Sequence, residues 1–505
     1  MDSSVCVRLF KESSMHRPAR KYIRNYGGWF FIRFKSILLS PFKLCNCFGR
    51  LSKCATMLKS QSGEQFPVKL RPDEESTTDP EAIQIETHGH VLKQIVVPFI
   101  IAGLGMVVAG MFLDRAQAWD VFVNVSEIMI LVPSLLGLKG NLEMTLASRL
   151  STSANLGKMD DPKEQVSMIC GNLSLVQLQS IVVGLLSSIV AVCSSALFKY
   201  DLNISHSLLL ASCSIVTASS ASLILGAITS MVIIASRRYS VNPDNIATPI
   251  AGSLGDITSL VLLSLIATAV YNSGDNMAAI SVLIIVLFLG IMPLWYFISK
   301  RNEHTKTVLF TGWKPIIFSM MISTVGGLIL DKMVQKYSGI AVFQPVINGV
   351  GGNLVSIQAS RLATALHQRE GTDTPGYLPP GYSILPSPYQ VFLSEHRHAV
   401  TARVLLFLVL PGQMFFSLVI CFLKTSHIWL NVPFLILYII AALIQVILLL
   451  YLATVLTNYC WSKECDPDNT TIPYLTALGD LFGIILLAAV FQILNMIGMP
   501  FKLAA

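Results

Sequence analysis

Two aspartates inside long apolar segments are the residues of this sequence best suited to chemistry. Asp256 lies about eight residues into one such segment, and Asp480 lies at a similar depth in another. A carboxylate in a membrane-spanning helix costs about 2.5–3.5 kcal/mol even on insertion scales. Neither segment carries a Lys or Arg that would compensate this cost. We therefore expect both aspartates to bind a cation; the alternative is a structural carboxylate hydrogen-bonded to Ser, Thr or Asn.

Two Gly-Asn pairs form a second element with ligand chemistry. Gly140-Asn141 and Gly352-Asn353 each place a neutral side-chain oxygen beside a residue that lets helices or backbone carbonyls come close. The alternative interpretation is close helix packing, with Asn as an interhelical hydrogen-bonding residue. In the expected topology, these pairs and the two aspartates lie between the middle of the membrane and its inner face. The Gly-Asn pairs and the aspartates can therefore contribute to one site.

A doubled acidic motif precedes each of the two aspartates. It reads Asn242-Pro-Asp-Asn245 in one copy and Asp466-Pro-Asp-Asn469 in the other, which is typical of a capped helix start with proline in the first turn. Asp244 precedes Asp256 by twelve residues, or roughly 18 Å of helix rise. Capping alone accounts for the motif, but Asp244 and Asp468 are also candidates for an acidic entrance that concentrates cations.

Glu143 has no acidic counterpart, because Val355 stands at the matching position. We expect Glu143, near the inner end of its span, to be an asymmetric proton or ion group. The histidines and cysteines show no ligand spacing, which argues against zinc or copper as the main substrate. Carboxylate and amide oxygens select hard cations such as Mg2+, Mn2+ or Ca2+. Two carboxylates suit a partly hydrated Mg2+ best, and no cofactor is expected.

An internal repeat relates these motifs to one another. Residues 133–150 recur 212 positions later as residues 345–362, and residues 242–256 recur 224 positions later as residues 466–480. Similar offsets in separate segments make chance a poor explanation. Each half of the chain therefore supplies one aspartate and one Gly-Asn pair, as expected for a site on a twofold axis.

The composition excludes a soluble enzyme or a nucleic-acid binder. Of 505 residues, 53% are hydrophobic and only 13% are charged, about half the usual ~25% of soluble domains. Long apolar runs begin after residue 91 and indicate an all-α polytopic membrane protein. We predict about eleven spans, near residues 93–113, 121–140, 167–197, 206–236, 248–271, 276–298, 313–330, 340–360, 399–423, 428–456 and 474–497.

The repeat divides these spans into two five-helix units, residues 93–271 and 313–497, joined by a connector helix at 276–298. Five is an odd number, so two directly joined halves would point in opposite directions. The connector restores the direction, which predicts parallel halves and a pseudo-twofold axis along the membrane normal. Residues 1–92 are expected to be a basic, largely disordered arm, and residues 498–505 a short tail.

Basic residues orient the chain, because cytoplasmic loops are enriched in Lys and Arg. With the N-terminus in the cytosol (or the matrix), fourteen loop Lys and Arg lie inside, among them Lys139, Arg149 and Arg361, against six outside. The basic N-terminal sixty residues resemble either a mitochondrial presequence or an arm on an anionic membrane surface. We expect the plasma membrane, with the mitochondrial inner membrane as the alternative.

The motifs at residues 137–150, 242–249 and 466–469 resemble those of the MgtE magnesium-transporter family, and specifically its eukaryotic branch, solute carrier family 41. The resemblance covers about residues 90–500. It implies two fused copies of a five-helix unit that bacterial relatives assemble as a homodimer, so we expect a monomer. It also implies Mg2+ as substrate, with the pore aspartate of the family at Asp256 and Asp480.

The family's Gly-Asn helix likewise maps onto Asn141 and Asn353. Residues 1–92 are too short and polar to match the cytosolic sensing domains of bacterial members. The animal branch resembles Na+-coupled exchangers, whereas the bacterial proteins resemble channels. We therefore expect a Na+-coupled Mg2+ exchanger or efflux carrier in the lipid bilayer, with a channel-like Mg2+ permease as the alternative. The sequence itself shows no Na+ site.

Two functions of other classes are alternatives to transport. Intramembrane aspartyl proteases resemble this chain in carrying two acids within the membrane, but Ser253 and Ala477 replace the first glycine of their Gly-x-Gly-Asp motif. Their Pro-Ala-Leu motif does not occur either. A scaffold or lipid-binding protein would not need duplicated buried acids. We predict a transporter, not an enzyme.

Overall fold

A computed structural model describes residues 88–125, 127–199, 203–337, 339–369, 376–378, 382–425 and 432–498. The expected N-terminal arm lies outside the described residues up to position 87, and the expected tail lies outside them after Gly498. The last residues assigned to the arm, from His88, already belong to the first helix, α4. The first helix therefore begins five residues before the predicted span.

All regular elements of the described residues are helical. The first half contains α4 (His88–Ala116), α5 (Asp120–Asn124), α6 (Glu127–Asn155), α7 (Pro162–Lys199), α8 (Ile204–Arg238), the 3-10 helix η2 (Pro243–Asn245) and α9 (Ala247–Tyr271). Then follow η3 (Gly274–Asn276), α10 (Met277–Arg301) and α11 (Val308–Thr311). The second half contains α12 (Trp313–Lys336), α13 (Ile340–His367), α14 (Pro388–Phe392), α15 (Arg397–Thr425), α16 (Val432–Ser462) and α17 (Pro467–Met496).

Ten helical segments of the described chain are long and apolar enough to cross a membrane, and α6 is an eleventh long helix outside that set. α6 carries Lys139, Glu143 and Arg149 along 29 residues. The side chains of Lys139 and Glu143 are 1% and 0% exposed, so neighbouring helices shield them from lipid. The prediction of an all-α polytopic membrane protein is thereby confirmed.

The second predicted span, 121–140, is wrong in its bounds. Its first residues form the separate short helix α5, and α6 continues fifteen residues past position 140. Lys139, Arg149 and Arg361, which the sequence predicts to be loop residues, lie inside α6 and α13. Polar residues lower the local hydropathy and so end a predicted span. Here Lys139 pairs with Glu143 of the same helix, and Arg149 and Arg361 bind asparagines of the other half, so both helices continue.

The two halves meet along α6 and α13. The hydroxyl oxygens of Ser148 and Ser360 lie 3.1 Å apart, and those of Thr152 and Thr364, one turn further along both helices, also lie 3.1 Å apart. Both pairs join residues 212 positions apart. Equal steps along both helices mean that α6 and α13 run parallel, with a pseudo-twofold axis between them.

The halves also interlock through their first helices. α4 packs against α9 of its own half and α13 of the other, and α12 packs against α17 and α6 in the same way. Glycines allow this approach: a Cβ at Gly110 would lie 2.4 Å from the carbonyl oxygen of Val342, and one at Gly327 would lie 3.2 Å from Pro133. Neither half therefore encloses the space between them alone.

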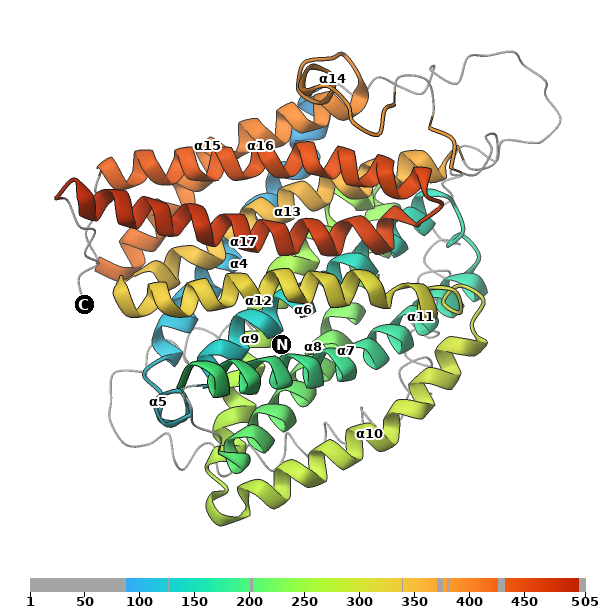
Figure 1. The fold of residues 1–505 in the computed structure, drawn as a ribbon. Coiled ribbons are helices and arrows are strands. Elements are labelled where there is room, and N and C mark those ends of the chain that lie inside the picture. Colours follow the sequence, from blue (N-terminus) through green and yellow to red (C-terminus); the bar gives the residue numbers. More distant parts are fainter. Residues whose placement is uncertain are drawn as a thin grey trace. The chain divides into compact units, whose positions relative to one another are not determined.

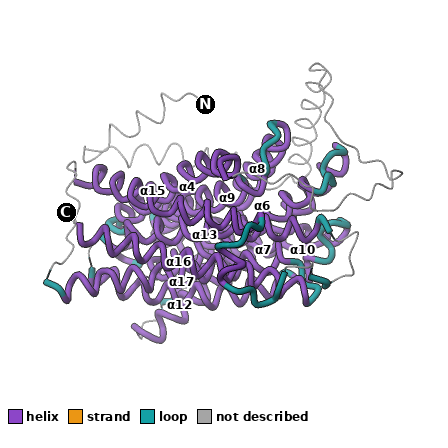
Figure 2. Tube along the Cα trace, turned by 90° about the horizontal axis from the view of Figure 1, so that it is seen from above, coloured by secondary structure: helices purple, strands orange, loops and turns teal. Residues whose placement is uncertain are grey.

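The connector α10 lies at the periphery of the helical assembly. It packs against α7 and α8 and runs along one edge in Figure 1. Figure 2 places it beside α7, on the far side from α15. Only 17% of its most apolar stretch is buried, compared with 89% for α13. α10 thus links the halves without taking part in the contact between them.

Candidate cation site

A cavity of about 70 Å³ lies where the two halves meet. Six helices line it: α4, α6 and α9 from the first half, and their counterparts α12, α13 and α17 from the second. A space of this size holds a few water molecules. Residues from both halves can therefore contribute to one site in this cavity.

The lining residues are themselves related by the repeat. Asp256 and Asp480 occupy equivalent positions on α9 and α17, and both line the cavity. The equivalent lining pairs of α6 and α13 are Pro133 and Pro345, Gly137 and Gly349, Gly140 and Gly352, and Asn141 and Asn353. The structure therefore brings together all four main candidate residues around the pseudo-twofold axis.

The two aspartates both approach α6 at glycines. The Oδ2 atom of Asp480 lies 3.2 Å from the place a Cβ would occupy at Gly137, and Oδ1 of Asp256 lies 3.9 Å from the corresponding place at Gly140. Both carboxylates line the same cavity. Two like charges held around one cavity form an attractive site for a cation.

The two asparagines have different surroundings. The Thr476 hydroxyl donates a hydrogen bond to Oδ1 of Asn141. The counterpart of Thr476 is Gly252, which gives Asn353 no such donor. Neither polar atom of the Asn353 side chain has a hydrogen-bond partner among the described residues, although the side chain is buried. A buried amide at a cavity wall without a partner fits a ligand or water that occupies the cavity.

Sequence reasoning missed four polar lining residues, Ser323, Gln344, Asn348 and Thr476. Their counterparts in the first half are Met106, Val132, Leu136 and Gly252, so the repeat did not mark them. All four belong to the second half, which makes that side of the cavity more polar.

Asp244 and Asp468 do not line the cavity. They lie where α6 and α13 end, in a hydrogen-bonded layer around the touching hydroxyls of Ser148 and Ser360. Ser360 donates to Oδ1 of Asp244 at 2.9 Å, and Ser148 donates to Oδ1 of Asp468. Each aspartate thus receives a hydrogen bond from the opposite half. This layer stands between the cavity and the C-terminal ends of α6 and α13.

The neighbouring residues of the acidic motifs strengthen these contacts between halves. Arg149 donates to Oδ1 of Asn469 at 3.2 Å, and Arg361 donates to Oδ1 of Asn245 at 2.9 Å. The motifs also form the expected helix caps. Oδ1 of Asn242 accepts a hydrogen bond from the backbone N–H of Asp244 at the start of η2, and the side chain of Asp466 accepts one from the backbone N–H of Asp468 at the start of α17. The same short motif therefore starts a helix and binds the other half.

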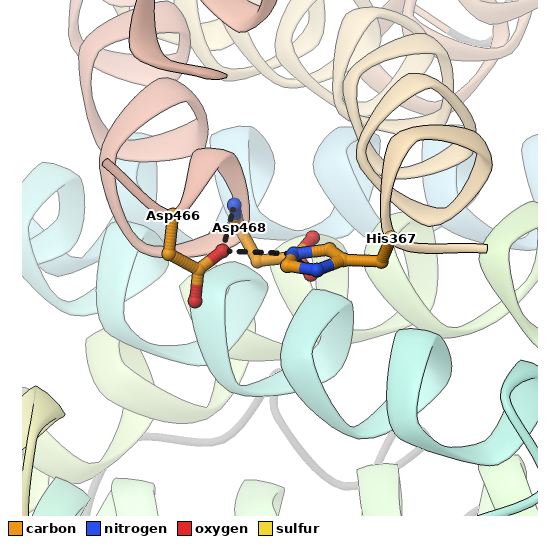
Figure 3. A group of neighbouring side chains, drawn as sticks. All are labelled: His367, Asp466 and Asp468. Atoms are coloured by element: carbon orange, nitrogen blue, oxygen red, sulfur yellow. Dashed lines mark hydrogen bonds and ion pairs between the residues drawn. The ribbon is translucent and has the colours of Figure 1, made fainter. Parts of the chain in front are cut away.

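One copy of this layer contains a histidine, as Figure 3 shows. Nε2 of His367 lies 3.3 Å from Oδ1 of Asp466 and 3.9 Å from Oδ2 of Asp468, and one ligand atom of each residue lies within 4.8 Å of the others. Asn155 occupies the equivalent position in the first half, where it donates to Asn242 and Asp244. The chain spacing of the histidines did not reveal this cluster, because His367 ends α13 whereas the aspartates begin α17.

Glu143 lies outside the cavity lining, in the middle of α6. Its position near an inner helix end was wrongly expected, because α6 extends to Asn155. Oε1 of Glu143 lies 3.3 Å from Nζ of Lys139, one turn earlier. The two residues form a buried ion pair behind the cavity wall.

Comparison with known proteins places this geometry in a family. The MgtE model, described as a divalent cation transporter, matches residues 132–266 and 344–490. Solute carrier family 41 member 2 of Mus musculus is 45% identical over 455 residues, which cover 90% of this chain and 78% of the mouse protein. The Homo sapiens member 2 is 46% identical over 82% of this chain and 72% of its own length. Member 3 of Mus musculus is 46% identical over 79% of this chain and 81% of its own length.

The family match covers the cavity-lining residues of α6, α9, α13 and α17, and the family consists of transporters rather than enzymes. The chain belongs to the MgtE family of divalent cation transporters, in solute carrier family 41.

Proposed function

We propose that this protein transports Mg2+, held in the central cavity between the carboxylates of Asp256 and Asp480. The observation that carries the proposal is the delivery of one carboxylate from each half to a single cavity. The side-chain oxygens of Asn141 and Asn353 supply neutral ligands on the same axis. Oxygen ligands without nitrogen or sulfur are typical of hard cations.

Mg2+ is the divalent cation that best suits this set. It loses water reluctantly and is commonly bound by one or two carboxylates while several waters remain in place. A cavity of about 70 Å³ accommodates a few waters around an ion. Ca2+ takes six to eight oxygen ligands, and two carboxylates with two amides reach six only if both carboxylates bind through both oxygens.

The proposed transport cycle is that of a carrier, and we favour Na+-coupled exchange or efflux. The layer of Ser148, Ser360, Asp244 and Asp468 holds the halves together at one end of the cavity. A carrier needs such a contact to open and close around a fixed site. A channel-like Mg2+ permease is the second candidate, and a Na+ gradient that leaves Mg2+ flux unchanged would favour it.

For the assembled protein we propose a monomer in the plasma membrane, with the N-terminus in the cytosol. The pseudo-twofold site is complete within one chain, so a second copy is not needed to supply an aspartate. The mitochondrial inner membrane, with the N-terminus in the matrix, is the alternative location.

Mg2+ flux into proteoliposomes tests the site directly. Asp256→Asn and Asp480→Asn are each expected to lower the flux by about tenfold or more, because each removes one of two charges that bind the ion. Asp275→Asn is the matched control, since Asp275 is an exposed acid in η3 outside the cavity. Normal flux in both cavity variants would refute the assignment.

A further inference from the structure

The Lys139–Glu143 pair lies beside the cavity and belongs to no element of the proposed site. Nζ of Lys139 lies 3.3 Å from Oε1 of Glu143, and the two side chains are 1% and 0% exposed. Burying an ion pair costs about as much as its attraction returns, so such a pair is weak evidence for a role in stability. Its position next to a charged cavity suggests an electrostatic role instead.

The second half has no such pair. Gly351 and Val355 stand at the equivalent positions, and the side chain of Gln445 from α16 lies against Gly351, 2.9 Å from the place of a Cβ. Nε2 of Gln445 donates to the carbonyl of Gly479, the residue before Asp480. A neutral amide thus supports one aspartate where a charged pair accompanies the other.

Lys139 lies next to a second carboxylate. It pairs with Glu143, and the carboxylate of Asp256 approaches α6 at the next residue, Gly140. Glu143 holds Lys139 through Oε1. Removing either partner of the pair would therefore change the charge that Asp256 experiences.

The formal charges of this region match one divalent ion. Asp256, Asp480 and Glu143 contribute three negative charges and Lys139 contributes one positive charge, which leaves a net charge of minus two. We propose that Lys139 is a built-in counter-ion: held by Glu143, it sets the cavity charge for a single divalent cation and competes with that cation for Asp256. This inference rests on the proposed function, in which Asp256 and Asp480 bind the ion.

Three variants separate this role from a structural one. Lys139→Gln leaves a charge of minus three, so the apparent affinity for Mg2+ should rise by about fivefold or more. The maximal flux should fall because the ion is released more slowly. Glu143→Gln frees Lys139 to pair with Asp256, so the affinity should drop by about tenfold or more. The double variant restores minus two and should return the affinity to within about threefold of the original protein.

The measurements are the Mg2+ concentration for half-maximal flux in proteoliposomes and Mg2+ titration calorimetry of the purified full-length protein. Lys424→Gln is the control, because it removes a lysine that pairs with Asp114 between α15 and α4, and neither residue lines the cavity. It should leave both values unchanged. If Lys139→Gln does not fold, Lys139→Met, which suits the buried position better, replaces it.

Single variants that change the affinity in the same direction, or not at all, would overturn the counter-ion role. A double variant whose affinity for Mg2+ differs from that of the original protein as much as the more affected single variant would also overturn it. These outcomes are distinct from failure of the proposed function, which would show as normal flux in both Asp256→Asn and Asp480→Asn.

Discussion

At the scale of single residues, the site depends on glycines as much as on acids. Gly137 leaves room for the Asp480 carboxylate, since a Cβ there would lie 3.2 Å from Oδ2 and 3.0 Å from the Ser323 hydroxyl. The same helix approaches Asp256 less closely at Gly140, where the distance is 3.9 Å. The repeat marked these glycines in the sequence, but only the distances distinguish a tight position from a roomy one.

Replacing Gly137 with Ala should therefore displace the Asp480 carboxylate or the Ser323 side chain. We expect Mg2+ flux to fall by about threefold or more while the protein still folds, because the neighbours that must move are side chains and not backbone. Gly105→Ala on α4 serves as the control, since its nearest neighbours would lie 3.4 Å from the new Cβ. Equal flux in the two variants would show that the carboxylate position tolerates this crowding.

At the scale of helices, the parallel contact of α6 and α13 unites the two halves. The pairs Ser148–Ser360 and Thr152–Thr364 lie on the axis, and hydrogen bonds to Asp244 and Asp468 extend this layer to η2 and α17. Hydroxyls on facing helices can exchange hydrogen-bond partners at a small cost in free energy, because each new partner also offers an acceptor. A layer made of hydroxyl groups and carboxylates therefore suits a contact that opens during transport.

A disulfide across this layer should hold it closed. In a Ser148→Cys, Ser360→Cys double variant, mild oxidation should cross-link the halves and abolish Mg2+ flux, and a reducing agent should restore it. Each single variant, treated in the same way, controls for reaction of the native cysteines. If the cross-link forms and the flux persists, the two halves do not need to separate at this layer.

At the scale of the whole molecule, the fused halves behave as two interlocked subunits. α4 contacts α13 and α12 contacts α6, and each half supplies three of the six helices that line the cavity. The connector α10 packs against α7, α8 and α9 of the first half. The covalent link between halves is thus separate from the contacts that build the site.

A chain divided between α10 and α11 should for this reason still assemble. Fragments 1–306 and 307–505, produced together, are expected to copurify and to transport Mg2+, whereas either fragment alone should not transport it. Copurification on a tag attached to one fragment, followed by a flux assay, provides the measurement. Failure to copurify would show that the link through α10 is required for the halves to associate.

The sequence by itself determined the helical membrane class, the family and the placement of Asp256, Asp480, Asn141 and Asn353 as one candidate set. Hydropathy and duplication can be recognised in the sequence alone, because neither depends on how the helices pack. The tertiary structure alone decided that Thr476 contacts Asn141, that His367 joins Asp466 and Asp468, and that Lys139 is a buried partner of Glu143 and not a loop residue. These contacts depend on how helices distant in the chain approach one another, and on asymmetric substitutions that break the repeat.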